Sequence, residues 1–142
     1  MKAWMVLAVA LLLGGCGART LDYTPSAIDP ALGRASIEQV LRGLPGKRGP
    51  DKVFVTPDYF GYARGPLYAE PAANGETPKA AGKSVQVQVY YKDVSKVDLI
   101  EKNRGRTIVL VRNAKGRNLY KAVVTDLALA HRFADAVMQF KR

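Results

Sequence analysis

Residues 85–91 read Val-Gln-Val-Gln-Val-Tyr-Tyr, an alternation of apolar and polar side chains. Successive side chains of a β-strand point to opposite faces, so this period of two places the valines and Tyr91 together on one face. The glutamines then lie on the other face. We therefore predict a half-buried strand, with its valine face in the core and its glutamine face in water.

Downstream of this strand, short turns separate three more extended stretches. Residues 94–100, 107–111 and 119–124 are rich in apolar side chains, and turn-forming residues at 102–106 and 113–116 connect them. Extended stretches joined by such short turns pair with their neighbours in antiparallel order. The sequence therefore predicts a three-stranded antiparallel meander.

A helix is predicted over residues 126–141, at the end of the meander. Thr125 is the expected N-cap, and Asp126 supplies a negative charge that favours the first turn. One apolar stripe follows the helical period: Leu129, Phe133, Ala136, Val137 and Phe140. We expect this stripe to dock on the sheet.

Upstream of the valine strand, the sequence predicts a short helix and a strand pair. The helix covers residues 36–44, and the strands cover 52–55 and 59–63. Residues 65–83 are rich in proline, glycine and alanine and are expected to form an exposed, mobile loop. Within it, Tyr68 is a candidate partner-binding aromatic, with plain disorder as the alternative.

The order of these elements resembles that of pleckstrin-homology-like domains. The segments that carry the resemblance are 52–62 (Lys-Val-Phe-Val-Thr-Pro-Asp-Tyr-Phe-Gly-Tyr), 90–97 (Tyr-Tyr-Lys-Asp-Val-Ser-Lys-Val) and 130–137 (Ala-His-Arg-Phe-Ala-Asp-Ala-Val). The resemblance covers roughly residues 50–142, within a single domain predicted over residues 35–142. It implies an α+β fold with a strongly bent antiparallel sheet of five to seven strands, closed by the C-terminal amphipathic helix. It also implies a scaffold that usually binds lipids, peptides or proteins and seldom catalyses. A simpler α+β sheet with one covering helix accounts for the same elements.

The first fifteen residues have the layout of a secretory signal. Lys2 precedes an apolar core at residues 3–13, and Gly14-Gly15 form a small-residue exit. The apolar core is too short for a transmembrane helix, which needs about 20 residues. We therefore expect residues 1–15 to be removed on export.

The sequence Leu13-Gly14-Gly15-Cys16 resembles the bacterial lipobox. The resemblance implies cleavage after Gly15 and a diacylglyceryl group on Cys16, the single cysteine of the chain. Two or more acyl chains hold a protein stably on a membrane. Gly17 stands where aspartate favours the inner membrane in enterobacteria, so the outer membrane is favoured. Residues 16–34 contain few periodic apolar side chains and are predicted to be the lipidated cysteine and a flexible tether.

The chain is strongly basic, with a formal net charge of +10. Seven cations follow one another without an intervening acidic residue: Lys102, Arg104, Arg106, Arg112, Lys115, Arg117 and Lys121. They are candidate anion-binding residues, and the alternative is a solvated surface that resists aggregation. Because consecutive turns of a meander lie at opposite ends of the sheet, we expect the seven to divide into two groups.

Few residues suggest chemistry. His131, the single histidine, falls off the apolar stripe and is expected to be exposed, without the partners that a metal site needs. Asp93, Asp98 and Glu101 are interpreted as surface charges, since nothing nearby indicates the burial that would shift a pKa. We expect no catalytic residues, metal or cofactor.

Taken together, the sequence predicts a lipid-anchored envelope protein that faces the periplasm. We expect a non-enzymatic binding or assembly module for an envelope protein, a lipid headgroup or an anionic cell-wall polymer. Nucleic acid is not an expected partner, because the basic residues form no long run and are not interleaved with aromatics. The alternative is a hydrolytic enzyme acting on an envelope substrate.

Overall fold

The computed structural model describes residues 17–43, 49–65 and 84–141. Its elements in chain order are β1 (Ala18–Leu21), α2 (Pro30–Arg42), β2 (Lys52–Val55), β3 (Tyr59–Arg64), β4 (Val85–Tyr90), the 3₁₀ turn η1 (Tyr91–Asp93), β5 (Lys96–Lys102), β6 (Arg106–Arg112), β7 (Asn118–Val124) and α3 (Leu127–Phe140). The predicted α+β class and C-terminal helix are confirmed. Cys16, Tyr68 and most of the predicted loop lie outside the described residues.

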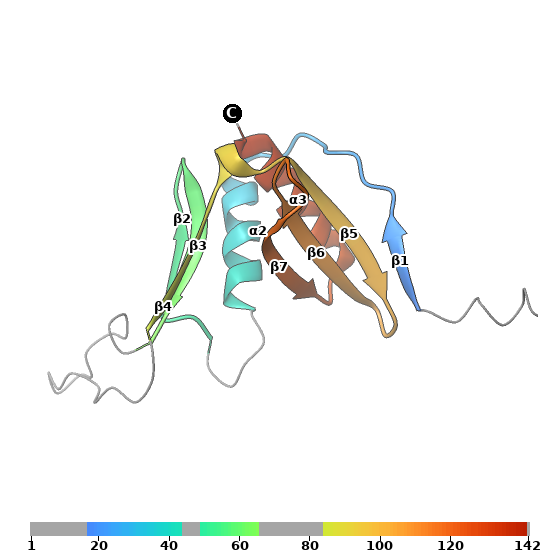
Figure 1. The fold of residues 1–142 in the computed structure, drawn as a ribbon, viewed down its shortest axis with the longest axis horizontal. Coiled ribbons are helices and arrows are strands. Elements are labelled where there is room, and N and C mark those ends of the chain that lie inside the picture. Colours follow the sequence, from blue (N-terminus) through green and yellow to red (C-terminus); the bar gives the residue numbers. More distant parts are fainter. Residues whose placement is uncertain (1–16, 44–48, 66–83, 142) are drawn as a thin grey trace, which may run out of the picture.

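The strands form two antiparallel sheets, a four-stranded sheet in the order β1-β5-β6-β7 and a three-stranded sheet in the order β2-β3-β4. Helices α2 and α3 lie between the sheets (Figure 1). Helix α2 contacts β2 and β3, α3 contacts β5, β6 and β7, and the helices contact each other. The single bent sheet that we expected is therefore not confirmed.

The period-two stretch forms strand β4, which confirms the predicted strand. It lies at the edge of the three-stranded sheet and pairs with β3. Its burial increases along the strand: Val85 is exposed, Val87 is half-buried and Val89 is buried. The chain then enters the core at Tyr91, which belongs to η1 and is also buried. The meander is confirmed by the antiparallel registers of β5 with β6 and of β6 with β7.

The aromatic centre of the core joins the two halves of the fold. Phe60 of β3 lies with its ring centroid 5.8 Å from that of Tyr91, 5.5 Å from that of Tyr120 and 5.7 Å from that of Phe133. These rings come from both sheets and from α3. Beside Phe60, Gly61 admits the neighbouring strand, because a Cβ there would overlap the backbone carbonyl of Val87.

Helix α3 begins one residue later than the predicted N-cap implied. Asp126, not Thr125, is the N-cap, and its carboxylate accepts a 2.9 Å hydrogen bond from the Ala128 amide. A carboxylate offers both the acceptor and the negative charge that the exposed amides of a first turn require. The apolar stripe is confirmed: Leu129, Phe133, Ala136 and Val137 are buried, and Phe140 is partly buried against the core.

The expected tether is corrected over residues 17–34. Strand β1 pairs with β5, and α2 starts at Pro30, with Asp29 as its N-cap, six residues before the predicted start. Between them, Asp135 and Gln139 of α3 hydrogen-bond to the intervening segment. The segment therefore follows the surface of the domain. Within the described residues, no helix is long and apolar enough to cross a membrane.

Candidate functional site

The seven candidate cations do not form one patch. Lys102, Arg104 and Arg106 lie at the β5–β6 turn, whereas Arg112, Lys115 and Arg117 lie at the β6–β7 turn. Strand β6, which separates the two turns, has seven residues and is therefore roughly 20 Å long. Lys121 is exposed in the middle of β7. The predicted division into two groups is confirmed.

We call Lys102, Arg104 and Arg106 the basic turn. Lys102 and Arg106 are cross-strand partners, and Arg104 sits between them with a positive φ of 71°. Like charges directly opposite each other destabilise a strand pair. Beside the turn, Arg19 of β1 lies 3.9 Å from the carboxylate of Glu101. The structure thus gathers three exposed cations next to a neighbouring pair of opposite charge.

The β6–β7 turn is organised differently. Arg112 lies 3.0 Å from the carboxylate of Asp98, so its charge is partly neutralised. Asn113 holds the turn, because its Oδ1 accepts hydrogen bonds from the Lys115 amide at 3.0 Å and the Arg117 amide at 2.9 Å. These contacts are those of a structural turn, with Lys115 and Arg117 exposed on it.

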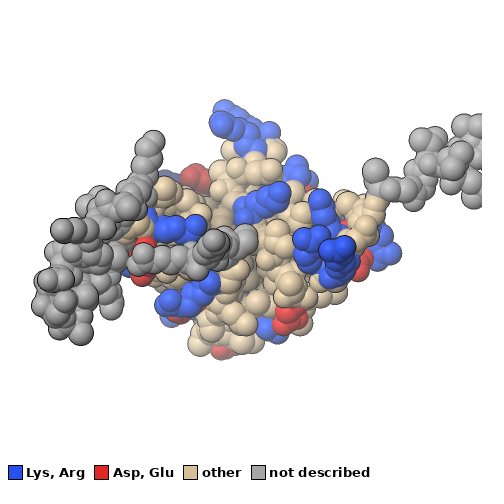
Figure 2. All heavy atoms as spheres, turned by 90° about the horizontal axis from the view of Figure 1, so that it is seen from below, with Lys and Arg blue, Asp and Glu red and all other residues tan. Residues whose placement is uncertain are grey.

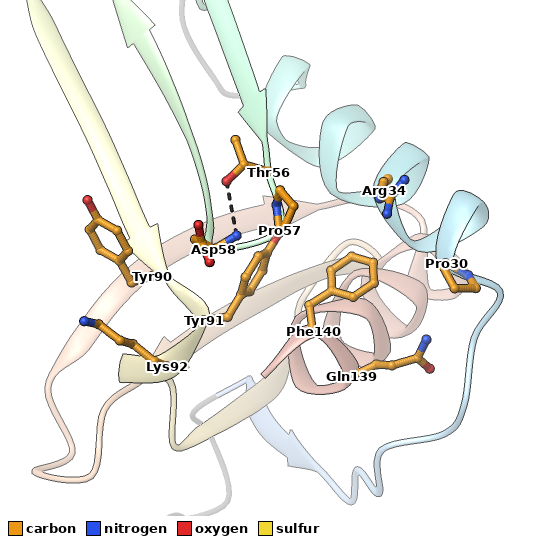
Figure 3. Close-up of a pocket in the computed structure, with 10 residues that line it drawn as sticks. All are labelled: Pro30, Arg34, Thr56, Pro57, Asp58, Tyr90, Tyr91, Lys92, Gln139 and Phe140. Carbon is orange, nitrogen blue, oxygen red and sulfur yellow. Dashed lines mark hydrogen bonds between the residues drawn. The ribbon is translucent and has the colours of Figure 1, made fainter. Parts of the chain in front are cut away.

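A hollow of about 660 Å³ opens at the end of the domain away from the basic turn (Figure 3). We call it the end pocket. Four parts of the chain form it: the start of α2, the β2–β3 turn, the passage from β4 into η1, and the end of α3. Its lining residues are Pro30, Arg34, Thr56, Pro57, Asp58, Tyr90, Tyr91, Lys92, Gln139 and Phe140.

Tyr91 is the most buried aromatic of the end pocket. Its ring packs 5.8 Å from Phe60 and 5.6 Å from Phe140, between centroids, yet its hydroxyl has no hydrogen-bond partner in the described part of the chain. Burial raises the pKa of Tyr91 well above its usual value, and the positive charge of Arg34 acts in the opposite direction. The hydroxyl thus stays protonated, a buried donor next to the hollow.

The rim of the end pocket is aromatic and charged. Tyr90 is exposed, its ring 5.4 Å from that of Tyr59, and the Lys92 ammonium lies 5.7 Å from its centroid. Thr56 fixes the β2–β3 turn, since its hydroxyl donates to the Tyr59 carbonyl and accepts from the Asp58 and Tyr59 amides. Among the described residues that line the pocket, Asp58 is the one carboxylate.

The remaining candidates have ordinary surroundings. His131 is half-buried, not exposed as we expected, because its ring lies 5.8 Å from that of Tyr23. Asp98 and Glu101 form the ion pairs described above. Among the described residues there is no group of three or more side chains that could hold a metal ion.

The chain has no significant match among protein-family models, curated proteins or solved structures. The features that indicate a function are therefore the basic turn and the end pocket, at the two ends of the domain.

The end pocket was not predicted from the sequence, although one signal was present. Tyr90-Tyr91 places two large aromatics on successive residues at the end of an alternating strand, so one of them must face outward.

Proposed function

We propose that this protein is an envelope lipoprotein, anchored through Cys16 and facing the periplasm, whose domain is a non-enzymatic binding module. Its partner is a segment of an envelope protein that enters the end pocket. The observation that carries this proposal is the buried hydroxyl of Tyr91, which has no hydrogen-bond partner among the described residues and belongs to the lining of a hollow with an aromatic rim. Aromatic anchors with a few polar groups are typical of partner-binding surfaces.

The chemistry of the lining favours binding. Pro30, Pro57 and Phe140 supply apolar surface, and Arg34 and Lys92 supply positive charge at the rim. A general acid–base pair needs two groups with matched pKa values, whereas the described part of the lining supplies a single carboxylate, Asp58, which is exposed. We therefore favour binding over the hydrolytic alternative.

The finer fold and location belong to the same proposal. A pleckstrin-homology-like relationship is supported by the strand hairpins that precede a C-terminal helix, and the division into two sheets counts against it. The lipobox-like residues support lipidation, and Gly17 favours the outer membrane. An anionic cell-wall polymer is the second candidate partner, supported by Arg34 and Lys92 at the rim.

The anchor is tested in cells with the full chain and its Cys16→Ala variant. We expect palmitate labelling and recovery in the membrane fraction for the full chain, with both lost in the variant. Unlabelled full chain in the soluble fraction would contradict the anchor.

The partner is tested by placing a photo-crosslinking amino acid at Lys92 in living cells. The matched control position is Lys121, which is equally cationic and exposed but lies on β7 outside the lining. We expect a crosslinked protein of defined mass only from position 92, and its yield should fall in Tyr91→Phe, which keeps the ring and removes the hydroxyl. The same products from both positions would contradict a pocket-specific partner, and crosslinked glycan in place of protein would favour the polymer.

A further inference from the structure

The chain enters the domain directly at the basic turn. A shallow hollow of about 390 Å³ lies between residues 17–19 and residues 101–105. Gly17 lies so close to the Asn103 side chain that a Cβ on it would overlap the amide group. The next residue, Ala18, is already the cross-strand partner of Lys102. The first residues after position 16 are therefore in contact with this turn.

This placement changes what a lipid on Cys16 would do. Neighbouring Cα atoms are about 3.8 Å apart, so residue 16 is one step from Gly17 and from the turn that Gly17 contacts. A tether of some 17 residues would have allowed the domain to stand roughly 55 Å from the membrane. With β1 paired to β5, the basic turn instead lies beside the first residues that follow the anchor.

The charge of this end suits an anionic surface. The basic turn contributes three exposed cations, and the neighbouring Glu101 is already opposite Arg19. Seen from below, blue side chains gather beside the start of β1, with one red group next to them (Figure 2). Lys102 faces Arg106 across the ladder at a cost to the strand pair, a cost that an anionic partner would remove.

The backbone of the turn points to the same use. Arg104 adopts a φ of 71°, in the left-handed region that costs a residue with a Cβ more than glycine. The next residue, Gly105, has a φ of 68° and pays no such cost. A strained arginine at the tip of a hairpin is expected where its side chain contributes something beyond folding.

We propose that the basic turn contacts the anionic phospholipid headgroups of the leaflet that holds the anchor, so that the domain sits directly on the membrane with its end pocket pointing away. The proposal rests on the proposed lipidation of Cys16. Each cation near such a surface increases the affinity for the membrane about fivefold, so the three together increase it on the order of 100-fold.

The test uses the soluble chain of residues 16–142 with Cys16→Ser, mixed with phosphatidylglycerol-containing or pure phosphatidylcholine vesicles at several salt concentrations. One variant replaces Lys102, Arg104 and Arg106 by glutamine. The matched control replaces Lys115, Arg117 and Lys121 and so removes the same charge from the other end and the middle of the sheet. Near-UV circular dichroism verifies that both variants are folded.

We expect the first variant to lose affinity for anionic vesicles on the order of 100-fold, and the control less than about fivefold. The binding of the parent chain should weaken with salt and be absent on phosphatidylcholine. Equal losses in the two variants, or no loss in either, would overturn the proposal. Binding confined to vesicles that contain lipopolysaccharide would overturn it too.

A second measurement examines the anchored state. The single thiol of Cys16 is coupled to a maleimide lipid in vesicles, and amide hydrogen exchange is followed at residues 102–106 and 113–117. Slower exchange only at 102–106, and only on anionic vesicles, is the expected result. In this experiment the lipid is attached chemically, so the two proposals can fail separately. Failed palmitate labelling in cells would contradict only the lipidation of Cys16. A lack of protection at residues 102–106 would contradict only the contact between the basic turn and the headgroups.

Discussion

We expect Arg104 to lower the folding stability of the domain and to strengthen its contact with the membrane. Arg104→Gly relieves the left-handed strain of about 1–2 kcal/mol but adds freedom to the unfolded chain, so we expect a net gain of about 0.5–1 kcal/mol in unfolding free energy. The same substitution removes one cation and should weaken binding to phosphatidylglycerol vesicles about fivefold. Urea denaturation and vesicle co-sedimentation measure the two effects.

The control for this prediction is Arg104→Lys, which keeps both the charge and the Cβ. It should leave unfolding free energy and vesicle affinity close to those of the parent chain. If Arg104→Gly lowered stability, the positive φ would not be a source of strain. If it left vesicle binding unchanged, Arg104 would not contact the headgroups.

At the level of elements, the segment that joins β1 to α2 depends on two side chains of α3. The Gln139 amide pairs with both backbone groups of Ile28, at 2.8 Å and 2.7 Å. Asp135 accepts hydrogen bonds from the Tyr23 hydroxyl at 2.8 Å and the Ser26 amide at 3.0 Å. These contacts hold the N-terminal segment against the domain.

We expect Gln139→Ala to loosen this segment without unfolding the meander. It leaves the amide and carbonyl of Ile28 without their partners, at a cost of about 1–3 kcal/mol. Hydrogen exchange at residues 18–28 should become faster, while exchange in β6 stays as slow as in the parent chain. Gln39→Ala, at an exposed position of α2, is the control. Uniformly faster exchange would show that the segment and the meander unfold together.

The elements that could be predicted from the sequence are those whose burial follows a local period. The alternation at 85–91 and the apolar stripe of α3 indicate which face is buried, so β4 and the closing helix can be predicted from neighbouring residues alone. Strand β1, Ala-Arg-Thr-Leu, has no such pattern, because it is held by backbone pairing with β5 about eighty residues later. The Asp29-Pro30 start of α2 was a readable signal, since both residue types favour a helix N-terminus.

The same reasoning explains why only part of the candidate sites was predicted. The division of the basic residues followed from meander geometry alone. The end pocket required four distant parts of the chain to converge, and Arg34 and Phe140 show no shared pattern in sequence. Tyr91 could be assigned to the buried face of the strand, but not recognised as a lining residue whose hydroxyl has no partner in the described part of the chain.

For the whole molecule, three tyrosines predict a loss of stability in alkali. Burial is the largest cause that raises the pKa of Tyr23, Tyr91 and Tyr120 above the ordinary 10.0, and a hydrogen bond to Asp135 adds to it at Tyr23. Below pH 10 both folded and unfolded chains keep these protons, so stability is unaffected. Above pH 10 the unfolded chain releases them first, and unfolding becomes more favourable.

We therefore expect the urea midpoint to fall steeply above pH 10, with absorbance at 295 nm showing that these tyrosinates form together with unfolding. Tyr120→Phe should reduce the steepness, because it removes one of the three protons and keeps the buried ring. A chain in which all seven tyrosines ionised near pH 10 while circular dichroism remained native would contradict the prediction.

The last prediction concerns how the two ends of the molecule work together. If the basic turn lies on the leaflet, the hairpin of β5 and β6 sets the end pocket roughly 20 Å or more from the membrane. Inserting about 20 glycine and serine residues between Gly17 and Ala18 separates the basic turn from the anchor by a flexible span of roughly 25 Å. On anionic vesicles, the lipid-coupled chain should then lose part of the exchange protection at residues 102–106, because only the three cations still draw the turn to the surface. Crosslinking from Lys92 should persist, since the pocket itself is unchanged.

Equal protection of residues 102–106 with and without the insertion would contradict this prediction. It would mean that charge alone brings the cations to the surface and that the position of Gly17 contributes nothing to the contact.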